Sequence, residues 1–417
     1  MGAANTEFDV VVIGGGASGM VAAGRAAELG KRVLLVEKNA TLGEKLKISG
    51  GGRCNITNAE PDVHKFLANY GKTGQFMHSA FAQFGVADTY SFFDKLGLPL
   101  VEQAHNRVFP KTERAADVVD ALKRYMEAGD VTVVTNAAVM QVSHEGNRIT
   151  GIAAGGTTYT AHSYIVATGG LSHPETGSTG DGFNWLKDLG HNVVSPTPMV
   201  VPIATMERWS HLLSGVSLPN GKITFYVDGV KQLTKKGSML FTHFGLSGPT
   251  ILNLSKAVAD LLPTGDVTAT IDSCPELDHG ALNAKIVAVF DANKNKAIKN
   301  VIDEIVAPGL AKGIWELLLT LDPETKVHSV TKEQRKQLVD TIKALPITVT
   351  GLLGFDKAVV VDGGVPLTEI DTKTMRSTIV ENLFVTGDLL HINRPSGGFS
   401  LQLCWTTGFV AGTHATA

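Results

Sequence analysis

The chain has 417 residues, of which 43% are hydrophobic and 18% charged, so it can build more than one buried core. Its net charge of −3 implies no large basic surface, which speaks against nucleic acid as a partner. Cys54, Cys274 and Cys404 form neither a CxxC pair nor a Cys/His spacing typical of zinc. We therefore expect no metal site and a reduced, cytoplasmic setting. No apolar run is long enough to span a membrane, so no membrane partner is expected.

The start of the chain predicts a nucleotide-binding unit. An apolar run at 8–13 predicts a buried strand, which stops on the glycine-rich stretch 14–19. An alanine-rich helix is expected over 20–29, and a second apolar strand over 32–36 closes on Glu37. Strand, G-x-G-x-x-G, helix, strand and acid stand in the order that a dinucleotide-binding βαβ unit needs.

Each part of this unit has a physical role. Gly14 permits a tight turn, Gly16 lets the backbone approach a pyrophosphate, and Gly19 lets helix and strand pack closely. The unpaired N–H groups and the dipole at the helix start favour the phosphate charge. Glu37 should accept hydrogen bonds from a ribose diol and repel a 2′-phosphate, so the nucleotide is FAD or NAD rather than NADP.

The next segment, residues 38–58, is polar and rich in glycine, which predicts an ordered loop beside the nucleotide. Residues 64–96 then predict a mostly helical region, and residues 112–128 predict a helix with Thr112 as its N-cap. Extended segments are expected at 107–110, 131–134 and 138–142, in a hairpin over 148–153 and 157–161, and in a buried strand at 164–167.

A second part of the chain begins near Val193, where prolines and a change of composition indicate a boundary. Residues 216–230 alternate as strands do, residues 250–262 predict a helix, and residues 282–345 are helical and charged. Apolar extended patterns return at 347–350, 358–361 and 383–388, and a closing helix follows from 397 to 411.

Several motifs together carry a resemblance to a known family. They are GGGRCNITN at 50–58, VFPKTERAADVV at 108–119, GSTGDG at 177–182, FTHFGLSGP at 241–249, DGGV at 362–365 and the C-terminal GD…SGGFSLQ…TGFVAG from 387 onward. With the G-x-G-x-x-G unit, these motifs span nearly the whole chain. The chain resembles the bacterial flavoprotein family often called BaiN-like or YhiN-like, whose relatives include an aminoacetone oxidase and a bile-acid-inducible steroid reductase.

The resemblance implies FAD bound to a Rossmann-like α/β domain of the two-dinucleotide-binding-domain type. It also implies an inserted β-barrel domain with a small helical insert. The expected bounds are 1–192 and 351–417 for the FAD-binding domain, 193–275 and 336–350 for the β-barrel, and 276–335 for the helical insert.

The motif positions give the FAD contacts that the resemblance implies. Asp388 is expected on the ribitol, and residues 397–400 against the flavin at a helix N-terminus, where the negative charge of a reduced flavin is stabilised. The expected cofactor-binding residues are Gly14, Gly16, Ala17, Ser18, Gly19, Glu37, Lys38, Lys45, Gly51, Gly52, Arg53, Cys54, Asn55, Val139, Thr168, Gly169, Gly170, Asp388, Gly397, Gly398, Phe399 and Ser400.

The C-terminal motif departs from the family pattern, which is close to GE-x-LD-x-x-G-x-x-GGYN-x-Q. Asp388 keeps the carboxylate, but His391, Arg394, Phe399 and Ser400 change the polar groups near the expected flavin edge. A histidine can move a proton near neutral pH, and an arginine can fix a carboxylate or carbonyl oxygen. The expected catalytic residues are His243, His173, Arg394 and His391.

We expect an FAD-dependent oxidoreductase that transfers a hydride between the flavin and a small or steroid-like organic substrate. A reductase fed by NAD(P)H is favoured, and since only one full G-x-G-x-x-G unit is present, NAD(P)H would dock transiently. The alternatives are an amine or aminoketone oxidase that uses O2 and produces H2O2, a non-catalytic FAD-binding redox sensor, and an NAD-only dehydrogenase.

Overall fold

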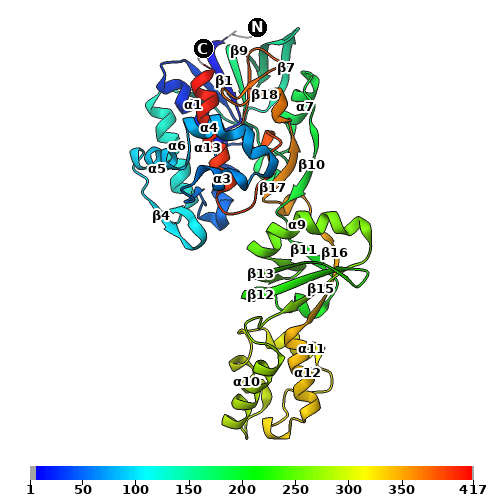
Figure 1. Cartoon of the computed structure of the whole chain (residues 1–417). Helices are drawn as coiled ribbons and strands as arrows, with labels where there is room; N and C mark the ends of the chain where they lie inside the picture. The colour runs from blue at the N-terminus through cyan, green and yellow to red at the C-terminus, as the bar shows by residue number, and fades with distance from the viewer. Residues whose placement is uncertain (1–5, 416–417) are drawn as a thin grey trace. The chain divides into compact units, whose positions relative to one another are not determined.

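The computed structural model describes residues 6–415 and divides the chain into two compact units. Unit 1 comprises residues 6–198 and 358–415, and unit 2 comprises residues 199–357. The chain leaves unit 1 once, builds unit 2 and returns, as the colours of Figure 1 show. Both ends of the described chain therefore belong to unit 1.

Unit 1 contains a sheet whose strands run in the order β18-β19-β20-β9-β1-β2-β6. β1 (Thr6–Ile13) is parallel to β2 (Val33–Val36) on one side and to β9 (Thr157–Val166) on the other. β6 (Thr132–Val134) and β20 (Leu383–Val385) extend the parallel part outward from β2 and β9. This arrangement confirms the Rossmann-like α/β fold class and places the last strand of the sheet close to the first.

The other strands of unit 1 lie at the sheet edge or in small separate sheets. β18 (Ile370–Asp371) and β19 (Arg376–Ser377) form the antiparallel edge, β7 (Val139–Glu145) and β8 (Arg148–Ala154) lead antiparallel into β9, β3 (Thr57–Asn58), β5 (Arg107–Pro110) and β4 (Leu100–Gln103) form a three-stranded sheet, and β10 (Val194–Met199) pairs with β17 (Val360–Gly364).

β9 is one continuous strand where the sequence predicted a hairpin strand at 157–161 and a separate buried strand at 164–167. Its first half pairs with β8 and stays half-buried or exposed. Its second half, from Ser163, lies between β1 and β20 and is buried. The change from polar to apolar residues therefore marks the point where the strand enters the core, and not its beginning.

Two long helices of unit 1 pack together, α1 (Ala17–Glu28) and α13 (Phe399–His414). They lie side by side in Figure 1, and glycines form their contact. A Cβ on Gly408 would stand 2.4 Å from the Ser18 carbonyl oxygen, and Gly412 makes the same kind of contact one turn later. A larger side chain at either position would push the helices apart, so the glycines fix this close packing.

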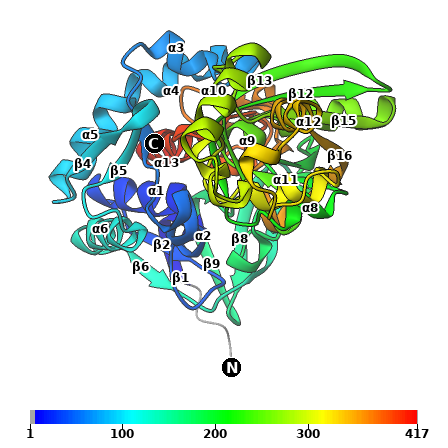
Figure 2. The ribbon, with the colours of Figure 1, turned by 90° about the horizontal axis from the view of Figure 1, so that it is seen from below.

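α6 (Ala115–Ala128) packs against α1 and lies beside it in Figure 2. The sequence predicted Thr112 as its N-cap, but the N-cap is Arg114. Glu113 has a left-handed backbone, with φ of 53°, and its N–H donates to the Pro110 carbonyl oxygen. The chain therefore turns here before the helix can begin.

The region predicted as helical over 64–96 is divided into short helices. A 3-10 segment, Gly71–Met77, and the extended N-cap Gly85 interrupt it. The shorter α-helices of unit 1 are α2 (Glu44–Ile48), α3 (Val63–Ala68), α4 (His78–Gln83), α5 (Val86–Lys95) and α7 (Asp181–Asp188).

Unit 2 contains a closed barrel with the strand order β11-β14-β13-β12-β15-β16. Ile223, Phe225 and Phe241 are fully buried and belong to the apolar core of the unit. The helices α8 (Arg208–His211) and α9 (Pro249–Leu261) pack against barrel strands. The strands are β11 (Ile203–Thr205), β12 (Ser217–Val227), β13 (Val230–Thr242), β14 (Gly245–Ser247), β15 (Val267–Asp272) and β16 (Leu345–Leu352).

A helical segment is inserted between β15 and β16. It contains α10 (His279–Ala292), α11 (Ala311–Leu317) and α12 (Lys332–Lys343). Ile286 and Leu338 of this segment are buried in the same apolar core as the barrel residues. Barrel and helices of unit 2 therefore share one continuous core.

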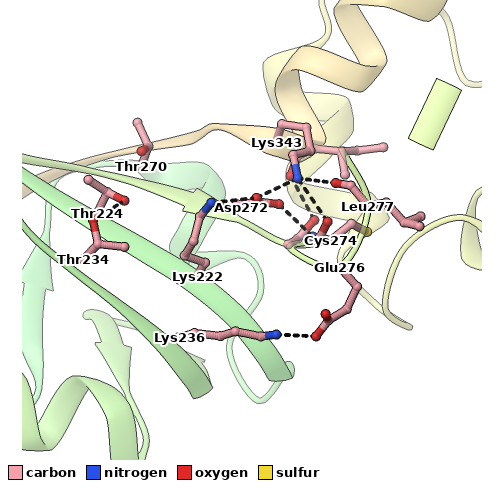
Figure 3. Close-up of polar contacts among 12 residues, drawn as sticks. Lys222, Thr224, Thr234, Lys236, Thr270, Asp272, Cys274, Glu276, Leu277 and Lys343 are labelled. Carbon is pink, nitrogen blue, oxygen red and sulfur yellow. Dashed lines mark hydrogen bonds and ion pairs between the residues drawn. The ribbon is translucent and has the colours of Figure 1, made fainter. Parts of the chain in front are cut away.

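An ion-pair cluster joins the two ends of this inserted segment (Figure 3). Lys343, at the end of α12, places its Nζ 2.7 Å from Oδ2 of Asp272, at the end of β15. Lys343 also donates to the carbonyl oxygens of Cys274 and Leu277, at 3.1 and 2.6 Å. The Asp272 and Lys343 side chains are only 5% and 9% exposed, so water stabilises these charges little and the ion pair between them is needed to compensate for their burial.

None of the described helices is long and apolar enough to cross a membrane. Within residues 6–415, no group of three or more His, Cys, Asp or Glu side chains could hold a metal ion. The three cysteines are free thiols. The cytoplasmic setting stays a prediction.

Candidate cofactor site

The three glycines of the first turn differ in what surrounds them. Gly14 has φ of +106°, and a Cβ there would stand 2.6 Å from the Ala167 carbonyl oxygen at the end of β9. A Cβ on Gly19 would stand 1.9 Å from the Gly14 carbonyl oxygen, so helix and turn touch at backbone distance. By contrast, no atom of the described residues lies within 4 Å of the Cβ position of Gly16. The turn thus closes on strand and helix and leaves open space at Gly16, where a phosphate group can approach.

Glu37 is held beside this turn. Its side chain is buried, and its two carboxylate oxygens accept hydrogen bonds from the backbone N–H groups of Gly15, at 2.7 Å, and Asn39, at 2.8 Å. These bonds fix the carboxylate next to the N-terminus of α1. From that position a carboxylate can accept hydrogen bonds from the hydroxyl groups of a nucleotide ribose.

Asp388 reaches the same end of α1 from the C-terminal part of the chain. It follows β20 and Gly387, whose backbone has φ of +62° and whose N–H donates to Thr407 Oγ1 at 3.0 Å. A Cβ on Gly387 would stand 2.9 Å from Ser18 Oγ, and Ser18 Oγ accepts a hydrogen bond from Thr386 Oγ1 at 3.1 Å. The turn at Gly387, after β20, therefore packs against the first turn of α1 at Ser18.

Two cations meet at Asp388. Lys45 Nζ, on α2, lies 2.9 Å from Asp388 Oδ2 and also donates to the Ser172 hydroxyl. The Arg394 guanidinium donates to Asp388 Oδ1 and to the Ile392 carbonyl oxygen. Each oxygen of the carboxylate therefore has a cation, although the Asp388 side chain is only 11% exposed.

These surroundings act on the pKa of Asp388 in opposite directions. Burial would raise the pKa of this carboxyl, but the charges of Lys45 and Arg394, and the hydrogen bonds they donate, hold the pKa well below its usual range. Asp388 is therefore ionised at neutral pH. In that form its oxygens only accept hydrogen bonds, which the hydroxyls of a sugar alcohol can donate.

The start of α13 forms another wall of the site. Its N-cap, Gly398, has φ of +103°, and a Cβ there would stand 2.3 Å from the Thr57 carbonyl carbon. Phe399 turns inward, with its ring centre 4.8 Å from that of Phe66. Ser400 Oγ is buried and has no hydrogen-bond partner among the described residues. The Gly397 carbonyl oxygen accepts from the Asn58 amide at 3.1 Å, so this backbone is held within unit 1, and the Phe399 side chain belongs to the core.

A buried network that the sequence did not predict fixes α13. Gln402 Oε1 accepts hydrogen bonds from Thr57 Oγ1 at 2.6 Å and from Thr89 Oγ1 at 3.0 Å, and its amide donates to Thr406 Oγ1 at 3.1 Å. All four side chains are buried. Gln402 lies in the SGGFSLQ motif, which was the only signal in the sequence for this role.

The three histidines predicted to be catalytic have different surroundings. His173 has φ of 53°, and its Nδ1 lies 2.8 Å from Glu175 Oε1. His391 Nε2 lies 3.4 Å from Asp362 Oδ1, and a third of its side chain, 33%, is exposed. His243 belongs to unit 2, where it is exposed between β13 and β14. Their catalytic roles stay predictions.

Arg394, the fourth predicted catalytic residue, is 1% exposed. Its guanidinium contacts Asp388 rather than a surface open to substrate. Its Nε is buried without a hydrogen-bond partner among the described residues. This geometry favours a positioning role, and a direct catalytic role stays a prediction.

The glycine-rich loop after α2 has an open part and a buried part. No described atom lies within 4 Å of the Cβ positions of Gly51 and Gly52, which both have positive φ, so these glycines face open space. The Arg53 guanidinium lies 4.4 Å from the centre of the Phe109 ring. Cys54 is fully buried, and burial raises the pKa of its thiol to about 12, which argues against a redox role.

Other predicted cofactor contacts are placed around the same turn. Lys38 Nζ lies 2.8 Å from Asp181 Oδ2 at the start of α7, so it ties the segment after Glu37 to that helix. In the orientation of its amide that satisfies both the oxygen and the nitrogen, Asn55 accepts a hydrogen bond from the Gly398 N–H at 3.0 Å and donates one to the Thr57 carbonyl oxygen at 3.1 Å. The remaining residues are Val139, which begins β7, and Thr168, Gly169 and Gly170, which follow β9.

Together these residues fit FAD. The open space at Gly16, the acid at Glu37 and the carboxylate at Asp388 match a pyrophosphate, a ribose and a sugar-alcohol chain in turn. The extra positive charge beside Asp388 suits a dinucleotide that carries negative charge.

The model of the family described as HI0933-like protein Rossmann domain matches residues 8–414. The chain belongs to the HI0933-like family. The match confirms the resemblance drawn from the motifs, because the βαβ unit, both units of the structure and the C-terminal motif all lie inside it.

The sequence of this HI0933-like chain aligns over almost its full length with those of two bacterial enzymes. It is 28% identical over 412 residues to a 3-dehydro-bile acid delta(4,6)-reductase from Clostridium scindens, which is 97% of this chain and 98% of that protein. It is 30% identical over 407 residues to a ribosomal RNA dihydrouridine synthase from Haemophilus influenzae, which is 96% of each.

A solved structure supports the fold of this HI0933-like protein. The structure is a 3-ketosteroid delta1-dehydrogenase from Sterolibacterium denitrificans in complex with 1,4-androstadiene-3,17-dione. It matches with a TM-score of 0.56 at 13% identity, over 99% of this chain and 100% of that one. At this identity the likeness shows the shared fold.

Proposed function

We propose that this protein is an FAD-dependent reductase of a carbon–carbon double bond conjugated with a carbonyl group. The substrate is a small or steroid-like organic molecule, and NAD(P)H is the source of the hydride. The observation that carries the proposal is the cofactor site itself, in which the open turn at Gly16, Glu37 and Asp388 all border the N-terminus of α1. An FAD-dependent oxidoreductase is the class of enzyme that such a site serves.

The residues of unit 1 hold the parts of the cofactor. The turn from Gly14 to Gly19 takes the pyrophosphate, Glu37 takes the adenosine ribose, and Asp388 takes ribitol hydroxyls. Bound there, FAD supplies a carrier that accepts two electrons and a proton as a hydride and gives them up again.

Shared chemistry in the names of the relatives favours a reductase over an oxidase. A bile acid with a 3-oxo group and delta-4 and delta-6 double bonds is a conjugated ketone, and the uracil ring of uridine also has a double bond conjugated with a carbonyl. Reduction of either adds a hydride to the carbon remote from the carbonyl and a proton to the neighbouring carbon. A histidine is suited to give that proton, and the Glu175 carboxylate orients the ring of His173.

The nicotinamide donor needs no domain of its own in this proposal. The sequence holds one full G-x-G-x-x-G unit, and Glu37 in that unit is suited to an unphosphorylated ribose. NAD(P)H therefore docks transiently at the flavin and leaves before the organic substrate enters.

A second candidate substrate is a uridine within ribosomal RNA. It is favoured by the likeness to the Haemophilus influenzae dihydrouridine synthase over 96% of both chains. The same hydride chemistry would apply, and only the recognition of the rest of the molecule would differ. The net charge of −3 speaks against nucleic acid as a partner, and therefore against the RNA substrate but not against the small-molecule substrate.

The deciding experiment starts from the protein reduced with one equivalent of NADPH or NADH without oxygen. Three acceptors are then compared: a 4-en-3-one steroid, an unmodified ribosomal RNA transcript, and air. Recovery of the flavin absorption band with the steroid supports the leading proposal, and recovery with the RNA alone supports the second. Reduction by an amine and recovery only in air would overturn both and indicate an oxidase. A flavin that responds to none of these compounds would indicate a redox sensor.

A further inference from the structure

Arg394 brings a charge into the interior of unit 1, at a position where the resemblance drawn from the motifs implies glycine. Its side chain is 1% exposed, although an arginine is almost never buried without full pairing. Its guanidinium pairs with Asp388 and Ile392, but its Nε has no partner among the described residues. The chain thus keeps a buried cation, which is costly, on the short loop before α13, the helix expected to border the flavin.

The charges around Arg394 do not balance within the described residues. Asp388 contributes one negative charge, whereas Lys45 and Arg394 contribute two positive charges. Two other titratable groups that interact with these charges are neutral: burial raises the pKa of the Cys404 thiol to about 12 and that of the Tyr70 hydroxyl well above its usual value. One positive charge is therefore in surplus in a largely buried cluster.

A surplus buried charge of this kind favours an anion nearby. FAD brings negative charge in two places, the pyrophosphate and, after reduction, the flavin ring. The pyrophosphate is already served by the open turn at Gly16 and the N-terminus of α1. Arg394 instead stands on the short loop that leads into α13, whose N-cap is Gly398.

We propose that Arg394 is a positioning and redox-tuning residue. It fixes the Asp388 carboxylate for the cofactor, and its surplus charge stabilises the reduced flavin relative to the oxidised one. This inference rests on the proposed FAD site, and it assigns to the chain a more positive flavin reduction potential than an uncharged residue at position 394 would give.

The test is an anaerobic titration of the bound flavin against a reference dye, which measures its reduction potential. Arg394→Met should shift the two-electron equilibrium toward oxidised flavin by about tenfold, which is about 30 mV. Arg394→Lys should lie between Arg394→Met and the parent because it keeps the charge and loses the fork. Asp388→Asn should shift the equilibrium the opposite way, because it increases the surplus positive charge. Arg148→Met, which removes an exposed arginine of β8, is the control and should change nothing.

Opposite signs in Arg394→Met and Asp388→Asn establish the electrostatic role, since a merely structural disturbance would not reverse. Equal potentials in the parent, Arg394→Lys and Asp388→Asn would overturn it, even if Arg394→Met fails to fold. FAD content is measured alongside by absorbance of the released cofactor. A folded parent protein without FAD would refute the proposed function itself, whereas normal FAD content with unchanged potentials would refute only the role of Arg394.

Discussion

Lys45 and Asp388 are 343 positions apart in the sequence, yet Lys45 Nζ lies 2.9 Å from Asp388 Oδ2. Lys45 comes from α2, just after the nucleotide-binding turn, and Asp388 follows β20, after the chain has passed through unit 2 and returned. The pair therefore closes the cofactor site only when both parts of unit 1 are folded. Unit 2 is inserted in the sequence between the two segments of unit 1 that supply these residues.

Glu37→Arg should reduce FAD retention by about tenfold to a hundredfold. The change removes a charged hydrogen-bond acceptor, worth about 1.5–3 kcal/mol, and places a cation against the Gly15 and Asn39 N–H groups. The measurement is the amount of FAD per chain after dialysis. Glu127→Arg, which changes an exposed acid of α6, is the matched control and should retain FAD. Equal FAD content in both variants would refute the role of Glu37.

Gly16→Ala and Gly19→Ala should separate cofactor binding from folding. A methyl group at Gly16 enters open space, so the variant should keep its stability and lose about tenfold or more in FAD affinity. A methyl group at Gly19 would stand 1.9 Å from the Gly14 carbonyl oxygen, so that variant should lose about 1–3 kcal/mol of stability as well. Hydrogen exchange of α1 and FAD titration measure the two effects. Normal FAD affinity in Gly16→Ala would contradict the placement of the phosphate.

Asp388 should make the stability of unit 1 depend on pH in the acid range. Its pKa is lower in the folded chain than its ordinary value of 3.8, so the ionised form stabilises the fold. This contribution is fully present above the unfolded value and is lost as the pH falls toward the folded pKa. Asp388→Asn should cost about 3 kcal/mol near neutral pH, because it leaves Lys45 and Arg394 without an anion.

The measurement is hydrogen exchange of α13 in the FAD-free parent and the Asp388→Asn variant, from pH 7 downward. The gap between the two should stay constant until the pH approaches the unfolded value and should then narrow, because the parent carboxylate becomes protonated. A gap of the same size at every pH would show that the charge of Asp388 is not what stabilises unit 1.

Lys343→Met should destabilise unit 2 by about 3 kcal/mol, because the buried Asp272 carboxylate then keeps the Cys274 N–H at 3.1 Å but has Lys222, at 3.5 Å, as its remaining cation. Lys236→Met removes an exposed ion pair with Glu276 in the same cluster (Figure 3) and should cost less than about 1 kcal/mol. Hydrogen exchange of α12 measures both. A similar loss in the two variants would mean that burial is not what makes the Asp272–Lys343 pair important.

The sequence predicted those parts of unit 1 whose signals are local. The apolar strand, glycine turn, helix and acid from 8 to 37 each follow from neighbouring residues, and the structure has them as β1, α1 and β2. The continuity of β9 and the N-cap of α6 at Arg114 were missed. The first depends on the strands that β9 pairs with elsewhere in the chain, and the second on a left-handed turn at Glu113 that the sequence pattern does not reveal.

The candidate site also contains residues that the sequence could predict and contacts that it could not. The motifs singled out Glu37, Asp388 and the first glycine turn, and the structure brings all three to the N-terminus of α1, while their contacts with a cofactor stay predictions. The contact of Lys45 with Asp388 could not be foreseen, since the two residues are brought together only by the return of the chain from unit 2. The burial of Arg394 had no signal in its neighbouring residues either. An arginine in a polar, glycine-rich stretch looks exposed when only its neighbours are considered.

The most direct test of this account is the absorption spectrum of the purified protein, before and after addition of NADPH or NADH without oxygen. We predict about one FAD per chain and a flavin band that bleaches on addition of one of the two donors. A folded protein without FAD would contradict the cofactor site built on Gly16, Glu37 and Asp388. Bound FAD that neither donor bleaches, but that an amine does, would contradict the reductase and leave the site intact.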